Sequence, residues 1–366
     1  MRKGAAGTAW ASVISGIGGN DIGGDGVNTV CHYAEELENL LNQALPEEFV
    51  LSGMDTEHFT GMQVSDMLGE VWGHVESRIQ EPFEVLSLLA GVILLSALAE
   101  SFSTQKTAIS KICDVIAVLC ASVTAVRPVT EVFLNSGEVL EQSANFMTAF
   151  SGIFGGVLAV SGHLTASAGY QGAMLFLCDI ALEIATKILF PVLTMGICIS
   201  LADGINPEMS LGGVLNLIQR VSIWLNGILM ALFLGFLSVQ SVVAVSADRA
   251  GTKAVKYAIS GFVPFVGGAV SDAYTAVLGS MGVVKSTAGM TGVMAVTALL
   301  LPVMTDLFLY KMLMTIAGTV SEIFAQEGLS KLFRNLEKIV SIGFSVAVSF
   351  GVMFVVSIGL LMTLSN

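Results

Sequence analysis

Charged residues are scarce in this sequence, and long stretches contain none. Asp, Glu, Lys and Arg make up 12% of the chain, against about 25% in ordinary soluble domains, and hydrophobic residues reach 54%. Four stretches are free of charge altogether: residues 142–178, 221–247, 286–305 and 339–366. A helix of about 20 mostly apolar residues can cross a membrane, and a soluble protein of this size could hardly bury four of them. The sequence therefore predicts an all-α, polytopic transmembrane helical bundle.

Cysteine and histidine are also few, with five and four residues respectively. No two cysteines form a CxxC pair and the histidines are scattered, so neither a disulfide framework nor a metal site is indicated. Residues 279–286 (GSMGVVKS) are similar to a phosphate-binding loop, but Val284 stands where that motif requires a glycine before the lysine. No HExxH motif and no Ser/His/Asp constellation is evident. We therefore expect no catalytic activity, no cofactor and no metal.

The acidic residues concentrate near the N-terminus. The net charge is −13, and 14 of the 29 acidic residues lie within the first 84 positions beside only three basic residues. This balance argues against binding to nucleic acid. Residues 1–27 are rich in glycine and are expected to be flexible. Residues 28–46 and 64–80 each show the apolar periodicity of an amphipathic helix, so we predict an acidic amphipathic-helical N-terminal domain over residues 28–82.

Hydrophobic spans follow the N-terminal domain. About eight are predicted, at residues 83–99, 109–126, 143–164, 172–202, 222–245, 263–284, 291–321 and 340–363. The spans 172–202 and 291–321 are longer than one simple crossing needs, and each contains an interior proline, Pro191 or Pro302. Each is therefore expected to be kinked or tilted, or to combine an interfacial segment with a shorter crossing.

Basic residues near the ends of the spans predict the orientation in the membrane. With eight crossings, one side carries eight of them: Lys106, Lys111, Arg249, Lys253, Lys256, Lys331, Arg334 and Lys338. The other side carries Arg127, Arg220 and Lys285. Because Lys and Arg are enriched in cytoplasmic loops, both termini are expected outside the cytoplasm. Residues 1–3 (MRK) give the basic start of a signal peptide, but residues 5–18 are too rich in glycine and serine for its apolar core.

An internal repeat relates two parts of the hydrophobic region. Residues 167–174 (SAGYQGAM) are similar to residues 287–294 (TAGMTGVM), 120 positions later. Residues 216–223 (NLIQRVSI) are similar to residues 335–342 (NLEKIVSI), 119 positions later. Two matches in the same order and at nearly the same offset indicate a duplication.

The duplication predicts two membrane repeats, at residues 143–245 and 263–364, behind a leading pair of helices at residues 83–126. Each repeat would contain three spans, and an odd number of spans gives the two copies opposite directions. The predicted fold is thus a helical bundle with an inverted internal repeat. Inverted repeats are common in secondary transporters, although a repeat by itself does not establish transport.

Several charged residues lie inside the predicted spans. Asp179, Glu183 and Lys187 are spaced four apart, so they share one face of a helix. One interpretation is a polar pathway or ion-coupling site, because charges at membrane depth usually face a partner or a water-filled cavity. The other, favoured by the excess length of the span, is an amphipathic helix at the membrane surface with an ordinary ion pair. The other candidates for a polar pathway are Asp272, Asp306 and Lys311.

Glycines form a second set of candidate positions: Gly169, Gly172, Gly267, Gly268, Gly289 and Gly292. Those in the repeated segments are expected to let two helices approach closely, which is the favoured interpretation. Alternatively, they open a discontinuous helix whose N–H groups face a cavity. The adjacent pair at 267–268 predicts a helix break, after which Asp272 would be either a buried acid or a helix cap.

Residues 257–294 (YAISGFVPFVGGAVSDAYTAVLGSMGVVKSTAGMTGVM) closely resemble the stage III sporulation protein AE family of endospore-forming bacteria. The most telling part is the run PFVGGAVSDA at residues 264–273, together with Lys285. Hydrophobicity alone does not demand its proline, its paired glycines or its Ser-Asp. The resemblance extends more weakly over residues 30–364. Family members usually begin with a clear signal peptide, from which the first residues of this chain depart.

The resemblance implies a role in sporulation. Members of the family are subunits in the mother-cell membrane of a complex that joins a partner in the forespore membrane, an assembly described as a channel or secretion-like apparatus. The partners that the resemblance implies are other stage III sporulation membrane proteins and a cytoplasmic ATPase, in addition to the lipid bilayer that the apolar spans predict. The family offers no established catalytic residues.

Three functional hypotheses follow. The first is a multipass membrane component of this sporulation channel complex. The second is a stand-alone secondary transporter, suggested by the inverted repeat and the intramembrane charges. The third is a membrane scaffold that recruits partners through its acidic N-terminal domain. Replacing Asp179, Glu183 and Lys187 with alanine would impair a conduit or transporter, whereas a scaffold would tolerate that change and fail when residues 28–80 are removed.

Overall fold

The computed structural model describes residue 36, residues 39–40, and residues 78–102, 108–160, 164–205, 211–262 and 267–363. Every regular element among these residues is a helix, so the predicted all-α class is confirmed for the described part of the chain. The predicted flexible segment 1–27 and most of the predicted N-terminal domain lie outside the described residues.

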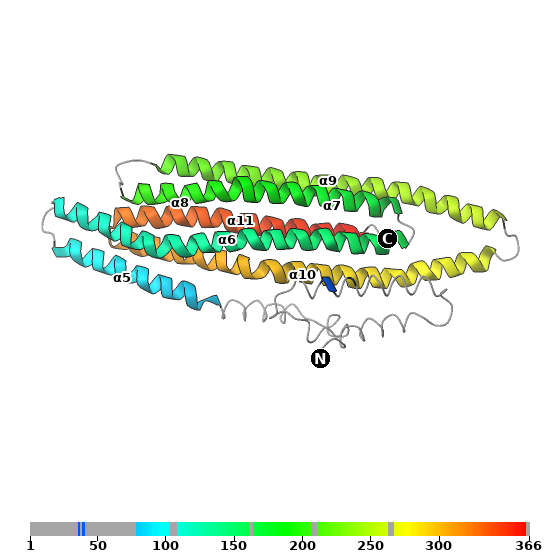
Figure 1. The fold of residues 1–366 in the computed structure, drawn as a ribbon, viewed down its shortest axis with the longest axis horizontal. Coiled ribbons are helices and arrows are strands. Elements are labelled where there is room, and N and C mark those ends of the chain that lie inside the picture. The colour runs from blue at the N-terminus through cyan, green and yellow to red at the C-terminus, as the bar shows by residue number, and fades with distance from the viewer. Residues whose placement is uncertain are drawn as a thin grey trace.

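Six long helical rods make up the described bundle (Figure 1). Five of them are the single helices α5 (Gln80–Phe102), α6 (Ala108–Val160), α9 (Gly212–Phe262), α10 (Gly267–Ile323) and α11 (Glu327–Thr363). The sixth joins α7 (Leu164–Ile184) through the π-helical turn η2 (Ala185–Leu189) to α8 (Phe190–Ile205). Each rod contains a stretch long and apolar enough to cross a membrane.

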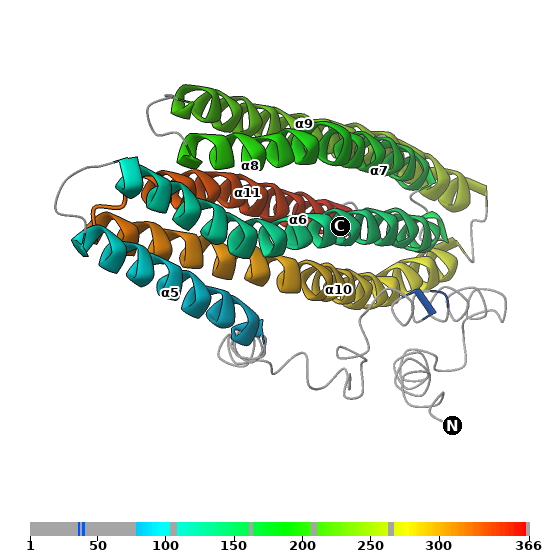
Figure 2. The ribbon, with the colours of Figure 1, turned by 60° about the vertical axis from the view of Figure 1, so that its left-hand side comes forward.

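Consecutive rods alternate in direction along an elongated bundle (Figures 1 and 2). The helix α11 is central, because it packs against α6, α8, α9 and α10. Its large apolar side chains therefore supply much of the core, and Phe333, Phe350 and Phe354 are completely buried. In a membrane, close packing of this kind rather than exclusion of water holds helices together.

The described residues contain six candidate spans, whereas the sequence predicted about eight for the chain. Span 109–126 and most of span 143–164 lie on α6, and span 291–321 and the described part of span 263–284 lie on α10. The residues that separate the spans are more polar, but polarity does not interrupt a helical backbone. On α6 even Pro128 is accommodated within the helix. The hydropathy pattern therefore divided two continuous helices into four spans.

The two copies of the repeat run in the same direction, so the prediction of an inverted repeat is corrected. Lys338 Nζ donates to Asn216 Oδ1 (3.0 Å), and Asn226 Nδ2 donates to Ser349 Oγ (2.8 Å). Residue numbers rise together in these contacts, so α9 and α11 are parallel. Each copy consists of two rods, α7–η2–α8 with α9 and α10 with α11, and an even number of rods preserves direction.

The π-helical turn η2 explains why the repeat offset changes from 120 to 119. The first copy has one more residue than the second between the two matched segments. In η2 the N–H of Phe190 donates to the carbonyl of Ala185, five residues earlier. A π-helical turn holds one more residue than an α-helical turn. It therefore absorbs the extra residue and leaves both matched segments in register.

The charge-free stretches lie side by side at one end of the bundle. The helix α10 has 57 residues and is about 85 Å long at 1.5 Å per residue, far more than one crossing needs. Its charge-free part, residues 286–305, is about 30 Å long, which matches the hydrocarbon core of a membrane. Gly292 in this part faces Phe150 of α6, and Gly289 faces Met362 of α11.

Candidate functional site

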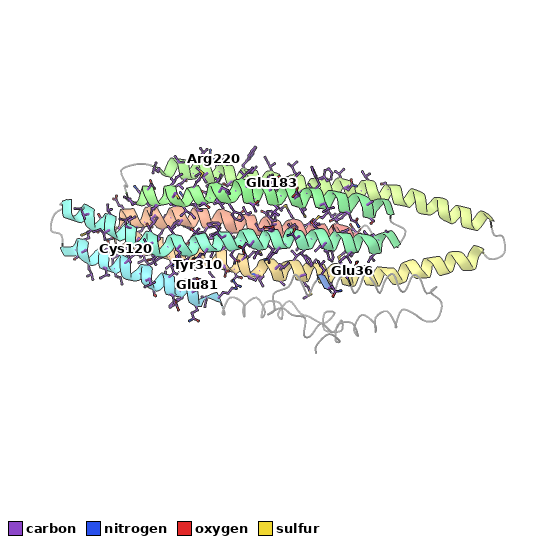
Figure 3. All side chains as sticks on the ribbon, viewed as in Figure 1. Glu36, Glu81, Cys120, Glu183, Arg220 and Tyr310 are labelled. Atoms are coloured by element: carbon purple, nitrogen blue, oxygen red, sulfur yellow. The ribbon has the colours of Figure 1, made fainter. Side chains whose placement is uncertain are left out.

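The three charged residues of α7 and η2 lie on the outside of the bundle. Asp179, Glu183 and Lys187 are exposed, whereas Ala181 and Ala185, on the other side of the same rod, are completely buried. Lys187 Nζ and Glu183 Oε1 form an ion pair between side chains that are 71% and 55% exposed, and Figure 3 marks Glu183 on this rod. A polar pathway through these residues stays a prediction, and it would run along the outer surface.

Asp306 and Lys311 lie on α10, away from the α7 charges. The side chain of Asp306 is 15% exposed, and its Oδ2 atom is 2.6 Å from Nη1 of Arg78. Because Arg78 lies two residues before α5, this ion pair ties the start of α5 to α10. Lys311 is half-buried on the same helix. In Figures 1 and 2, α6 and α11 lie between α10 and α7, so the structure does not bring the two charged groups together.

Three of the candidate glycines lie where two helices come close. A β-carbon on Gly169 would meet a side chain of α9, and one on Gly289 or Gly292 would meet a side chain of α11 or α6. A β-carbon on Gly172 would have open space around it. All four glycines lie inside the continuous helices α7 and α10, and none of them opens a helix.

The helix α10 begins at Gly267, at the predicted helix break. Gly268 and Asp272 follow in its first turns, but the side chain of Asp272 lies outside the described residues, so its role stays a prediction. The end of α9 and the start of α10 project beyond the other rods in Figure 1. These projecting turns carry much of the stretch 257–294.

A buried polar pair that the sequence analysis missed lies at the end of the bundle opposite these projecting turns. Asp203 of α8, 4% exposed, accepts hydrogen bonds from Asn335 Nδ2 (2.8 Å) and from the backbone N–H of Leu211 (3.0 Å). Beside it, a β-carbon on Gly328 would lie only 2.8 Å from the carbonyl oxygen of Gly204. The carboxylate thus fixes α8 to α11 and to the start of α9, where the backbones are in close contact.

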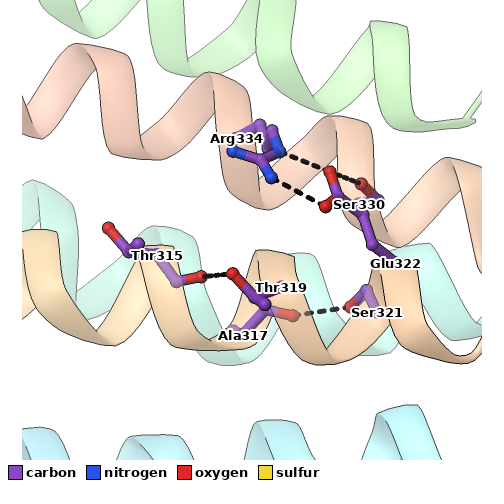
Figure 4. Close-up of polar contacts among 7 residues, drawn as sticks. All are labelled: Thr315, Ala317, Thr319, Ser321, Glu322, Ser330 and Arg334. Atoms are coloured by element: carbon purple, nitrogen blue, oxygen red, sulfur yellow. Dashed lines mark hydrogen bonds and ion pairs between the residues drawn. The ribbon is translucent and has the colours of Figure 1, made fainter.

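The second copy contains an equivalent acid, Glu322 of α10, 119 positions after Asp203. Its carboxylate accepts hydrogen bonds from Arg334 Nη2 (2.7 Å) and Ser330 Oγ (3.2 Å), as Figure 4 shows. Each acid accepts a hydrogen bond from the residue eight positions later, Leu211 or Ser330. The repeat is the signal that could have identified Asp203. Hydropathy places Asp203 and Glu322 each just beyond the end of a predicted span, and only the repeat offset shows that the two acids are equivalent.

Several of the described polar residues join helices to one another. Among them, no group of three His, Cys, Asp or Glu side chains is placed to hold a metal ion. Asn226 donates to Ser349, and Tyr170 OH donates to the carbonyl of Ser357 (2.7 Å). Ser96 Oγ donates to the side-chain oxygen of Gln326, which lies between α10 and α11. Their arrangement serves to orient helices, and it offers no pairing of a nucleophile with a base.

Comparisons with known proteins give a family for this fold. The family described as Stage III sporulation protein AE matches residues 51–365. The chain is also similar to the Bacillus subtilis (strain 168) protein named Stage III sporulation protein AE, with 22% identity over 201 residues. That alignment covers 55% of this chain and 50% of the relative, so the chain spans about half the length of the curated relative. No solved structure matches it. Because the family match extends over most of the sequence, this chain belongs to the Stage III sporulation protein AE family.

Proposed function

We propose that this protein is a multipass membrane component of the sporulation channel complex that links mother cell and forespore. The family match carries the proposal, and six helices long and apolar enough to cross a membrane support it. Its partners are other stage III sporulation membrane proteins and a cytoplasmic ATPase. A separate ATPase would supply the energy, because the phosphate-loop-like segment of this chain has Val284 in place of the required glycine.

The hydrocarbon core of the membrane surrounds the charge-free end of the bundle in this proposal. Here α6, α7, α9, α10 and α11 each contribute uncharged sequence. Its exposed side chains include large apolar ones, such as Phe176 (60%), Val242 (68%) and Met290 (53%). The other half exposes apolar residues such as Leu95 and Val123, but also charged residues such as Arg127 and Glu131. Exposed charges are costly at membrane depth, which favours placing them outside the core.

Basic residues indicate which end of the bundle faces the cytoplasm. In sequence, Lys106 falls between α5 and α6, and Lys111 falls at the start of α6. The first turns of α11 carry three more basic residues, Lys331, Arg334 and Lys338. The end of α5, the start of α6 and the start of α11 lie at the same end of the bundle (Figure 1). We place this end in the cytoplasm and the C-terminus on the opposite side. The three basic residues at 249–256 then lie outside, because α9 is one continuous helix.

The interior of the charge-free end is filled by aromatic side chains. The rings of Phe146, Phe150 and Phe154 follow one another along α6, with centroids 5.9 and 5.7 Å apart. Phe354 of α11 lies 6.4 Å from Phe233 of α9. A conduit through the centre of this chain would have to displace these buried rings. We therefore place the conduit between chains, with this protein as part of its wall.

The stand-alone transporter hypothesis loses its main support. It rested on an inverted repeat, whereas the two copies run in the same direction. It also rested on the charges of α7, which lie on the outer surface. The channel-component proposal needs neither feature.

Deletion of the gene in its spore-forming host tests the proposal. We expect sporulation to stop at stage III, with loss of late forespore-specific reporter expression, and a tagged copy to restore both. The tagged protein should co-purify with the cytoplasmic ATPase from membranes of sporulating cells. As a matched control, a copy with the exposed Glu183→Gln change should restore sporulation equally well. Normal spore yield without the gene would contradict the proposal.

A further inference from the structure

The two copies of the repeat share a contact at equivalent positions as well as sequence similarity. Asp203 and Glu322 are both acids at the end of the first rod of their copy. Each accepts a hydrogen bond from the residue eight positions later, and Asn216 and Asn335 both follow in the next helix. The helices from α7 to α11 thus form two helical hairpins of the same direction, and residues of one can be compared with residues of the other.

The second hairpin packs on the first through one face of α11. Asn335 donates to Asp203, and the carbonyl of Ser357 accepts from Tyr170. Side-chain atoms of Ile339 would lie 3.1 Å from a β-carbon on Gly196. Asn335, Ile339 and Ser357 are all buried. This face of α11 is therefore a helix-packing surface whose partner is the rod α7–η2–α8.

The equivalent face of α9 is exposed. Positions 119 residues before Asn335, Ile339 and Ser357 are Asn216, Arg220 and Ser238, and all three are exposed. Gly227 lies on the same face, at the position equivalent to the fully buried Val346, and nothing lies within 4 Å of a β-carbon built on it. We call these residues of the first hairpin the α9 face: Gly213, Asn216, Arg220, Gly227 and Ser238.

The surface that would fit the α9 face is exposed on the second hairpin. In the first hairpin, the side of α7–η2–α8 turned towards the core includes the buried residues Tyr170, Leu189, Leu193, Ile197, Ser200 and Asp203. The equivalent residues of α10 are all exposed, and we call them the α10 face: Met290, Phe308, Met312, Ile316, Thr319 and Glu322. The offset is 120 before η2 and 119 after it.

We propose that copies of this chain associate head to tail, with the α10 face of one copy docked on the α9 face of the next. The contact would repeat between chains the packing that already joins the two hairpins within one chain. Polar groups are compatible across it, because Glu322 would face Asn216 as Asp203 faces Asn335. The helices α9 and α10 lie on different sides of the bundle in Figures 1 and 2. Such a contact between two different faces continues from copy to copy, and it closes into a ring if the rotation allows.

Disulfide cross-linking between two differently tagged copies tests the proposal. Both copies carry alanine in place of the five native cysteines. One copy then carries Asn216→Cys and the other Glu322→Cys, and both are expressed together in membranes and oxidised with copper phenanthroline. We expect rapid formation of a product that carries both tags. As a control, Asn216→Cys is paired with Met195→Cys, an exposed position on α8 outside the α10 face, and should react at least tenfold more slowly.

A matched variant separates docking from folding. Gly227→Leu has open space within one chain, and leucine is a better helix former than glycine, so the single chain should keep its helical circular dichroism. The leucine should nevertheless lower the yield of the 216–322 product at least fivefold. If that variant loses helicity, Gly213→Leu, at another open position of the α9 face, replaces it.

Head-to-tail docking would be overturned by a 216–322 product that forms no faster than the control product. It would also be overturned by a dominant product between two copies of Asn216→Cys, or by a 216–322 yield that neither leucine change lowers. The experiment does not depend on the proposed role in sporulation, since it measures only the contact between copies.

Discussion

Removing the amide of Asn335 is the sharpest perturbation of the contact between the two hairpins. Asn335 Nδ2 donates to the carboxylate of Asp203, and both residues are at most 5% exposed. A hydrogen bond to a charged group contributes about 1.5–3 kcal/mol. We therefore expect Asn335→Ala to destabilise the fold by about 2 kcal/mol, because the carboxylate keeps only its bond from the backbone of Leu211.

The repeat supplies a matched control for this change. Asn216 is the equivalent residue of the first hairpin, but it is exposed and accepts a hydrogen bond from Lys338 at the surface. Surface substitutions usually change stability by less than about 0.5 kcal/mol, so Asn216→Ala should be nearly neutral. The two substitutions are chemically identical, but one removes a donor to a buried carboxylate and the other removes an acceptor at the surface.

Labelling of a buried thiol measures the effect. A chain that keeps only Cys178, which is 3% exposed, should react with a maleimide only when the bundle opens. A loss of about 2 kcal/mol corresponds to labelling roughly 30-fold faster when opening and closing are rapid. In a double-mutant cycle, Asp203→Ala and Asn335→Ala should be strongly non-additive. Equal labelling rates for Asn335→Ala and Asn216→Ala would refute the reasoning.

Three further predictions follow from other contacts. Gly328→Ala should destabilise the bundle by about 2 kcal/mol, measured by the same labelling rate, because its β-carbon would press on the carbonyl oxygen of Gly204. Arg78→Ala should cost about 1–3 kcal/mol in thermal unfolding in detergent, because it leaves Asp306 without its ion-pair partner in a partly buried site. An unchanged unfolding temperature would show that α5 is not held by this pair. Glu183→Gln should change the unfolding free energy by less than about 0.5 kcal/mol, since its partner is exposed, and a larger loss would indicate that this surface is covered.

The sequence predicts the helical membrane class well because that class depends on apolar runs, which are plain in the composition. It predicts the number of spans poorly for a physical reason. Charged residues such as Glu131 lower local hydropathy, yet they are good helix formers and α6 continues through them. The wrong number of spans then gave the wrong relative direction of the two repeat copies. Three spans per copy would invert the second copy, whereas two rods per copy leave both in the same direction.

The polar contacts were harder to predict than the fold. Asp179, Glu183 and Lys187 attract notice because they stand inside a predicted span, but they lie on the outer surface. Asp203 stands at the edge of the same span, where hydropathy assigns it to a loop, and its burial depends on Asn335 from a distant helix. The repeat marks both residues, since it pairs Asp203 with Glu322 and Asn335 with Asn216, but only the structure shows that they meet.

Sidedness of the rod ends tests the six-rod, same-direction account most directly. Single cysteines at the exposed positions Ala202, Glu327 and Ser246 are labelled in intact cells and in inverted vesicles with a membrane-impermeant maleimide. The account predicts that Ala202→Cys and Glu327→Cys are labelled from the same side, and Ser246→Cys from the other. Labelling of Ala202→Cys and Glu327→Cys from opposite sides would contradict it and restore the inverted arrangement.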